Sequence, residues 1–109
     1  MSKLNVPVEM LEAYKKFIKD DYIKWLQPVT ETRQEMIDRF IVDCEIGSSY
    51  IKIVRTGSVH SFIVNKAGKF PVGTILKAAG WKAPAKNFAR GNLLKPETWN
   101  GRIQWTGAA

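Results

Sequence analysis

The sequence predicts an α+β fold in which N-terminal helices pack on an antiparallel β-sheet. Through the first part of the chain, apolar residues recur at three- and four-residue steps, as they do on one face of a helix. Near Phe40 the spacing changes to two residues, which is typical of a strand, and short turns containing Gly and Ser separate the later apolar runs. A small, partly open barrel behind a helical N-terminus is the alternative architecture.

The first predicted element is an amphipathic helix over residues 8–26. Its apolar stripe consists of Leu11, Tyr14, Ile18, Tyr22 and Trp25. A proline is tolerated at the start of a helix and ends one further along, so Pro7 and Pro28 fit the two boundaries.

A second, shorter helix is expected over residues 33–39. Thr32 and Glu35 fit a capping box, in which the threonine hydroxyl caps the helix and the glutamate reaches back to the cap residue. The apolar residues Met36, Ile37 and Phe40 are then available for burial.

The remaining regular elements are strands. They are expected over 40–46, 50–54, 59–64 and 74–78, with turns at 47–49, 56–58 and 65–69. Residues 102–105 are candidates for a further edge strand. No internal repeat or linker divides the chain, so residues 1–109 are expected to form one domain with a helical part (1–39) and a basic, β-rich part (40–109).

Charge separates these two parts of the chain. Residues 1–49 carry 7 Lys and Arg against 9 Asp and Glu, a net −2, whereas residues 50–109 carry 10 against the single acid Glu97, a net +9. Such asymmetry predicts a positive surface and an anionic partner. Three of the four tryptophans, Trp81, Trp99 and Trp105, also lie in the basic part.

The sequence indicates a cytoplasmic protein that does not enter membranes. No apolar stretch approaches the roughly 20 residues that a membrane-spanning helix needs, and the N-terminus has no apolar segment of the kind found in secretory signals. The single cysteine, Cys44, excludes an internal disulfide and fits a reducing compartment, where we expect it to be a small buried apolar residue.

We predict that the protein is not an enzyme and uses no metal or cofactor. The chain has one histidine, His60, which strand alternation places on the same face as Ser58 and Phe62, bonded within the sheet. A structural zinc site needs about four Cys or His ligands, and no nucleotide-binding glycine motif is present. A hydrolase or nuclease using His60, with Cys44 as one conceivable nucleophile, is the catalytic alternative.

The segment 77–95 is the candidate binding site. Pro84 and Gly91 suit the two ends of a short helix over 85–90, which Phe88 would anchor to the core. Lys86 and Arg90 would then share one face, and the free N–H groups at the helix start would form a phosphate seat. The candidate anion-binding residues are Lys77, Trp81, Lys82, Lys86 and Arg90. An exposed Trp81 could stack on a base; a core position for this ring is the competing interpretation.

Residues 50–94 resemble small uncharacterised proteins of tailed bacteriophages. The resemblance is carried by Tyr-Ile-Lys-Ile at 50–53, Ser-Val-His-Ser-Phe at 58–62, Trp-Lys-Ala-Pro-Ala-Lys at 81–86 and Arg-Gly-Asn at 90–92. The resemblance implies a viral origin and a location in the cytoplasm of a host cell. It implies no activity. Where that pattern has a turn rich in Asp, this chain has Lys66-Ala67-Gly68-Lys69, which adds positive charge.

The expected function is therefore that of a small phage-type accessory protein that binds a polyanion. The favoured polyanion is nucleic acid, bound with weak sequence specificity. The first alternative is an inhibitor or adaptor that binds an acidic surface of a host protein through the same lysines. The sequence leaves the oligomeric state open.

Overall fold

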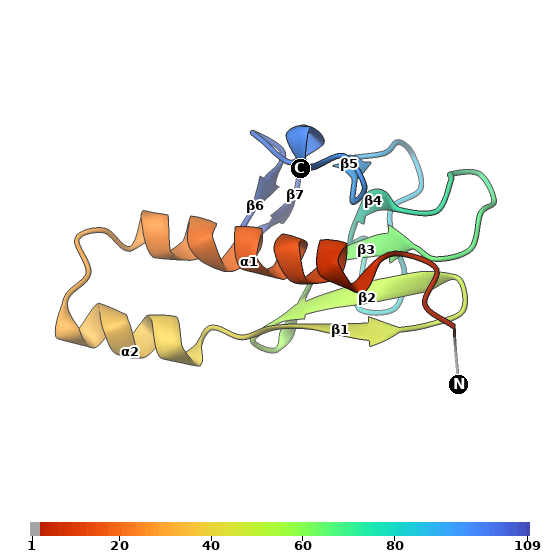
Figure 1. The fold of residues 1–109 in the computed structure, drawn as a ribbon. Coiled ribbons are helices and arrows are strands. Elements are labelled where there is room, and N and C mark those ends of the chain that lie inside the picture. The colour runs from red at the N-terminus through yellow and green to blue at the C-terminus, as the bar shows by residue number, and fades with distance from the viewer. Residues whose placement is uncertain (1–2) are drawn as a thin grey trace.

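Two helices precede the sheet in the computed structural model, which describes residues 3–109 (Figure 1). Helix α1 spans Val8–Trp25 and buries Leu11, Tyr14, Ile18 and Tyr22. The predicted helix over 8–26 is thus confirmed to within one residue, and so is the α+β class.

Helix α2, Glu31–Arg39, begins two residues earlier than predicted, and Thr30 rather than Thr32 caps it. The Thr30 hydroxyl accepts a hydrogen bond from the backbone N–H of Arg33 at 3.2 Å. The Arg33 guanidinium reaches back to the carbonyl oxygens of Leu26 and Pro28, both at 3.0 Å. These contacts fix the helix start at Glu31, so Thr32 lies inside the first turn.

The main sheet has five antiparallel strands in sequence order. They are β1 (Val42–Ile46), β2 (Tyr50–Arg55), β3 (Ser58–Val64), β4 (Thr74–Lys77) and the short β5 (Gly91–Asn92). The strands pair only with their sequence neighbours, so β1 and β5 remain edges and the sheet does not close into a barrel. Phe40, predicted to begin the first strand, instead ends α2 and stacks on Tyr22 with ring centroids 4.1 Å apart.

The two faces of the sheet contact different parts of the chain. The inner face lies against α1 and contributes Ile51, Ile53, Ile63 and Ile75 to the main core. The outer face carries a smaller cluster of Phe62, Val64 and Leu76, with Tyr50, Val59, Phe70 and Ala78 packed around it. No helix covers this outer cluster in the part of the chain that the structure describes, because both helices pack on the main core.

The C-terminal residues complete the inner core. After the 3₁₀ turn η1 (Pro96–Thr98), β6 (Ile103–Gln104) pairs with β7 (Gly107–Ala108) as a separate two-stranded sheet. A strand thus forms within the predicted residues 102–105, but the prediction that it adds an edge to the main sheet is wrong, since it pairs with 107–108 instead. In Figure 1 α1 lies between β1 and this hairpin, and it contacts both.

A β-bulge reverses the predicted orientation of His60. Ile53 pairs with Ser61 and Val54 with Val59, so His60 is the extra residue on β3. Because of this extra residue, His60 and Ser61 both reach Tyr14 on the inner face, whereas Phe62 packs in the outer cluster. The prediction that His60 shares the face of Phe62 was wrong.

Candidate anion-binding surfaces

The segment that joins β4 to β5 is irregular and contains no helix. The backbone N–H groups of Ala79 and Gly80 donate to Ala83 O, and that of Ala85 donates to Lys77 O at 2.7 Å. These bonds fold the chain back along the end of β4, with a bridge between Ala78 and Pro84. A helix of six residues is costly to nucleate, and here the backbone finds partners on the sheet instead. The helix predicted over 85–90, and with it the phosphate seat at its start, is absent.

Lysine and aromatic side chains gather where this segment crosses the outer face. The Nζ atoms of three lysines lie over aromatic rings: Lys52 over Trp81 at 4.9 Å from the centroid, Lys86 over Tyr50 at 5.6 Å, and Lys69 over Phe70 at 5.5 Å. Lys82 lines a shallow groove of about 360 Å³ together with Tyr50, Lys52 and Phe62. We call this set the lysine–aromatic face: Tyr50, Lys52, Lys69, Phe70, Trp81, Lys82 and Lys86.

Contacts between strands and loops hold this face together. Lys69 Nζ donates to the carbonyl oxygen of Lys86 at 2.6 Å, which ties the β3–β4 loop to the β4–β5 segment. Lys52 is half-buried between Glu45 and Phe62, its neighbours on the adjacent strands. Trp81 remains 51% exposed, so its ring is available for stacking while Lys52 lies over it. The competing interpretation, that Trp81 is a core residue, is thereby corrected.

The structure brings together only three of the five predicted site residues: Trp81, Lys82 and Lys86. Lys77 lies on the opposite face of β4 from Leu76 and lines a cavity of about 270 Å³ beside His60. Arg90 is buried in a separate groove. Sequence reasoning missed Tyr50 and Lys52, although the two-residue period of β2 could have placed both on the face opposite Ile51 and Ile53.

Arg90 is held by its own segment of the chain. Its Nε donates to Phe88 O at 3.3 Å, its Nη2 donates to Asn87 Oδ1 at 3.1 Å, and the guanidinium lies 3.8 Å from the centroid of the Phe88 ring. Phe88 itself is 49% exposed, so the prediction that it anchors the segment in the core was wrong. Arg90 and Lys86 do not share an exposed helical face.

His60 belongs to a chain of buried hydrogen bonds. Its Nε2 lies 2.6 Å from the carbonyl oxygen of Gln104, which can only accept, so Nε2 carries the proton. Nδ1 then accepts from the Ser61 hydroxyl at 2.8 Å, and Ser61 Oγ accepts from the hydroxyl of Tyr14 at 2.8 Å. Tyr14 and Ser61 have no exposed surface and His60 only 2%, although His60 lies at the wall of the cavity that Lys77 lines.

Burial also determines how these groups titrate. Desolvation lowers the pKa of His60 from its ordinary 6.5 to about 4, and the nearby Arg55 cation acts in the same direction. Desolvation likewise raises the pKa of the Tyr14 hydroxyl above its ordinary range. His60 is thus neutral near pH 7, as its hydrogen bonds require.

Cys44 forms no pair with His60, because both ring nitrogens of the histidine bond other groups. The cysteine is half-buried on β1 and packs against the main core, and desolvation raises the pKa of its thiol. Within residues 3–109 no three His, Cys, Asp or Glu side chains lie close enough together to hold a metal ion. Over the same residues, none of the helices has the length and apolar character needed to cross a membrane.

Comparison with other proteins identifies a family for this chain but assigns it no activity. Searches of curated proteins and of solved structures found no match. Residues 4–109 match a protein family described as "Family of unknown function (DUF7717)". Since this match covers nearly the whole chain, the protein belongs to that family.

Proposed function

We propose that this protein binds nucleic acid through the lysine–aromatic face, with a preference for single strands and weak sequence specificity. The observation that carries the proposal is the exposed indole of Trp81 beneath Lys52, flanked by the exposed lysines Lys69, Lys82 and Lys86. Proteins that bind single strands combine basic side chains for the phosphates with aromatic rings for the unpaired bases.

The shape of the surface favours unpaired bases over duplex DNA. An aromatic ring can stack only on a base that is not enclosed in a duplex, and each such contact contributes roughly 1–3 kcal/mol. A duplex is normally read by a helix or a ribbon that enters a groove, whereas α1 buries its apolar side against the inner face of the sheet. Phosphate contacts and stacking alone carry little sequence information.

The role we propose is that of a non-catalytic accessory protein of a tailed bacteriophage, acting in the cytoplasm of the host cell. The support for this setting is the resemblance of residues 50–94 to phage proteins. The support for a non-catalytic role is the burial of His60 and Ser61.

Fluorescence titration with oligonucleotides tests the proposal directly. We expect a single-stranded oligonucleotide to quench tryptophan emission and to bind at about 50 mM salt, with an affinity that falls by roughly 0.7 of a decade per phosphate contact for each decade of salt. Duplex of the same length should bind more weakly. Absence of binding to either form at low salt would refute the proposal.

Two matched pairs of variants locate the surface. Trp81→Ala should lower the affinity for single strands about tenfold, whereas Trp25→Ala, which removes another exposed tryptophan (61%) at the end of α1, should not. Lys82→Gln with Lys86→Gln should make the slope of log affinity against log salt concentration shallower by roughly 1.4, because two phosphate contacts are lost and each contributes about 0.7. Lys16→Gln with Lys24→Gln, both exposed on α1, should leave the slope unchanged.

A pull-down from host lysate separates this proposal from the alternative partner, an acidic host protein. With the full chain as bait, nuclease treatment should release what is bound. A partner that survives nuclease and is lost in the Lys82→Gln, Lys86→Gln variant would instead support the inhibitor or adaptor role.

A further inference from the structure

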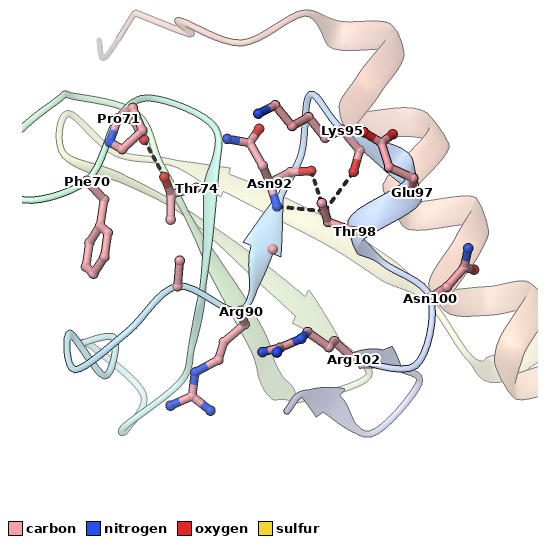
Figure 2. A pocket seen from close by; sticks show the side chains of 12 residues that line it. Phe70, Pro71, Thr74, Arg90, Asn92, Lys95, Glu97, Thr98, Asn100 and Arg102 are labelled. Atoms are coloured by element: carbon pink, nitrogen blue, oxygen red, sulfur yellow. Dashed lines mark hydrogen bonds between the residues drawn. The ribbon is translucent and has the colours of Figure 1, made fainter.

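A second basic surface, which adjoins the lysine–aromatic face at Phe70, lies in a groove between β5 and η1. It encloses about 620 Å³, and its charged lining residues are Arg90, Lys95, Arg102 and the single acid Glu97. Figure 2 shows Arg90 and Arg102 at one end of this groove, away from Lys95 and Glu97. We call it the arginine groove. Three cations against one carboxylate leave it with a positive surplus.

Arg90 is the unusual member of this groove because it is a buried cation without a carboxylate. It is only 7% exposed, and buried charges are normally paired because their desolvation is costly. The ion pairs found among residues 3–109 both lie on α1, Lys15 with Glu12 and Lys16 with Asp20. The guanidinium of Arg90 therefore lacks the anion that its burial calls for.

The guanidinium is also fixed in place. The backbone N–H of Arg90 donates to Ile75 O at 2.8 Å, which anchors the residue to β4. The bonds from Nε to Phe88 and from Nη2 to Asn87, with the Phe88 ring beneath, hold the guanidinium plane. Arginine has five N–H donors, so these two bonds leave three for a ligand. A planar fork held in this way suits an oxyanion.

Close packing holds the base of the groove together. A Cβ added at Gly91 would lie 3.1 Å from Thr98 Oγ1, so a side chain at this position would push Thr98 away by a few tenths of an ångström. The Thr98 hydroxyl donates to Lys95 O at 2.7 Å, and it accepts from the backbone N–H of Asn92 at 2.9 Å. The segment between Arg90 and Arg102 is thereby tied to the sheet.

We infer that the arginine groove binds a phosphate group, with Arg90 and Arg102 as the ligands that face it. A phosphate suits the groove better than a carboxylate, since its tetrahedrally arranged oxygens can accept hydrogen bonds from two guanidinium groups at once. Two sources share this chemistry: a free phosphate ester, and a backbone phosphate of a strand bound on the lysine–aromatic face. Phe70 lines the groove and also belongs to that face, so one strand could reach both.

The test is an NMR titration of the full chain with inorganic phosphate, following the Nε–H signals of its arginines. We expect saturable shifts of Arg90 and Arg102, and none at Arg39, which is exposed at the end of α2. Shifts that grow linearly without saturation, or that are equal at Arg39, would overturn the inference.

Variants assign the site and control for misfolding. Arg102→Gln should weaken phosphate binding about tenfold, the effect of losing one charged hydrogen-bond donor, and Arg39→Gln should leave it unchanged. Arg90→Lys keeps the charge but loses the fork, and should also weaken binding. Because Arg90 is buried, its variant is interpreted only if its amide spectrum remains native. If it does not, the test depends on Arg102, which is exposed. Unchanged binding in Arg102→Gln would overturn the assignment.

Repeating the titration with a saturating unphosphorylated oligonucleotide separates the two sources. If the groove takes a backbone phosphate, the oligonucleotide displaces inorganic phosphate, and Arg102→Gln lowers oligonucleotide affinity as well. If the groove takes a free phosphate ester, phosphate still binds in the presence of the oligonucleotide. Phosphate binding without any oligonucleotide binding would support the groove and refute the nucleic-acid proposal alone.

Discussion

At the scale of single residues, the most constrained part of the molecule is the buried chain that joins Tyr14, Ser61 and His60 to Gln104. Each bond has a fixed direction, because the carbonyl of Gln104 only accepts and sets the direction of every other bond. Polar groups buried to this degree are costly unless each has a partner. The network therefore joins α1, β3 and the C-terminal hairpin with a defined geometry.

Acid should destabilise the protein through His60. Its pKa of about 4 in the folded state lies below the ordinary 6.5, so between these values the unfolded chain binds a proton that the folded chain does not. The contribution of His60 to the free energy of unfolding should therefore level off above about pH 7 and fall by about 3 kcal/mol as the pH drops to 4. Urea unfolding at a series of pH values measures this.

His60→Gln is the control for that experiment. Carboxylates also titrate near pH 4, so the relevant quantity is the difference between the two proteins, which should shrink as the pH falls from 6.5. A difference independent of pH would mean that His60 has the same pKa in the folded and the unfolded protein, which would contradict its burial as a neutral imidazole.

Within the same network, Ser61→Ala should destabilise more than Tyr14→Phe. Removing the Tyr14 hydroxyl deprives Ser61 of one donor and should cost about 1 kcal/mol. Removing the Ser61 hydroxyl leaves both the Tyr14 hydroxyl and Nδ1 of His60 without a partner and should cost about 2–3 kcal/mol. Since both changes break one network, the double variant should cost less than the sum. Equal single costs, or additivity, would contradict the assigned network.

At the scale of elements, the start of α2 depends on which of two threonines caps it. Thr30→Ala removes the acceptor for the Arg33 N–H and should cost about 1 kcal/mol of unfolding free energy. Thr32→Ala lies inside the first turn, where alanine has the higher helix propensity, and should be neutral or stabilising by a few tenths of a kcal/mol. Thermal or urea unfolding measures the stability of the two variants. If Thr32 were the cap, Thr32→Ala would be the less stable of the two.

Elements with a regular spacing of apolar residues could be predicted from the sequence, whereas contacts that an irregular segment makes with a strand could not. The period of α1 and the strands through β4 follow from alternation and turn residues. The segment 78–90 could not be predicted, because its backbone bonds to Lys77 and Ala83 replace a helix that composition alone favours. The candidate site could be predicted only in part for the same reason: Trp81, Lys82 and Lys86 lie in one segment, but Lys52 joins them only through the register that pairs it with Phe62.

At the scale of the whole molecule, Asn65 links the N-terminal segment to the sheet. Its side chain donates to Lys3 O and Gly47 O, and accepts from the backbone N–H of Asn5, all within 2.9 Å. The residue has no exposed surface. One side chain thus joins the N-terminal segment, the β1–β2 turn and the end of β3.

Asn65→Ala should therefore destabilise the molecule by about 3 kcal/mol, because it removes three part-buried hydrogen bonds at about 1 kcal/mol each. Asn5→Ala, which loses the one bond from Asn5 Nδ2 to Asn65 O, should cost about 1 kcal/mol. Hydrogen exchange provides a second measurement, since the backbone amide of Asn5 should lose its protection from exchange in Asn65→Ala. Retained protection would show that another group holds the N-terminal segment.

The position of the C-terminal hairpin in the core determines when the protein can finish folding during its synthesis. Trp99, Ile103 and Ala108 are buried against α1 and the inner face of the sheet, and Gln104 provides the carbonyl that His60 requires. During synthesis α1 emerges from the ribosome first, yet its apolar side is fully covered only when residues as far as Ala108 have left the exit tunnel. Folding is therefore completed only after that stretch has been translated, and a ribosome that stalls before it exposes an unfinished core to chaperones and proteases.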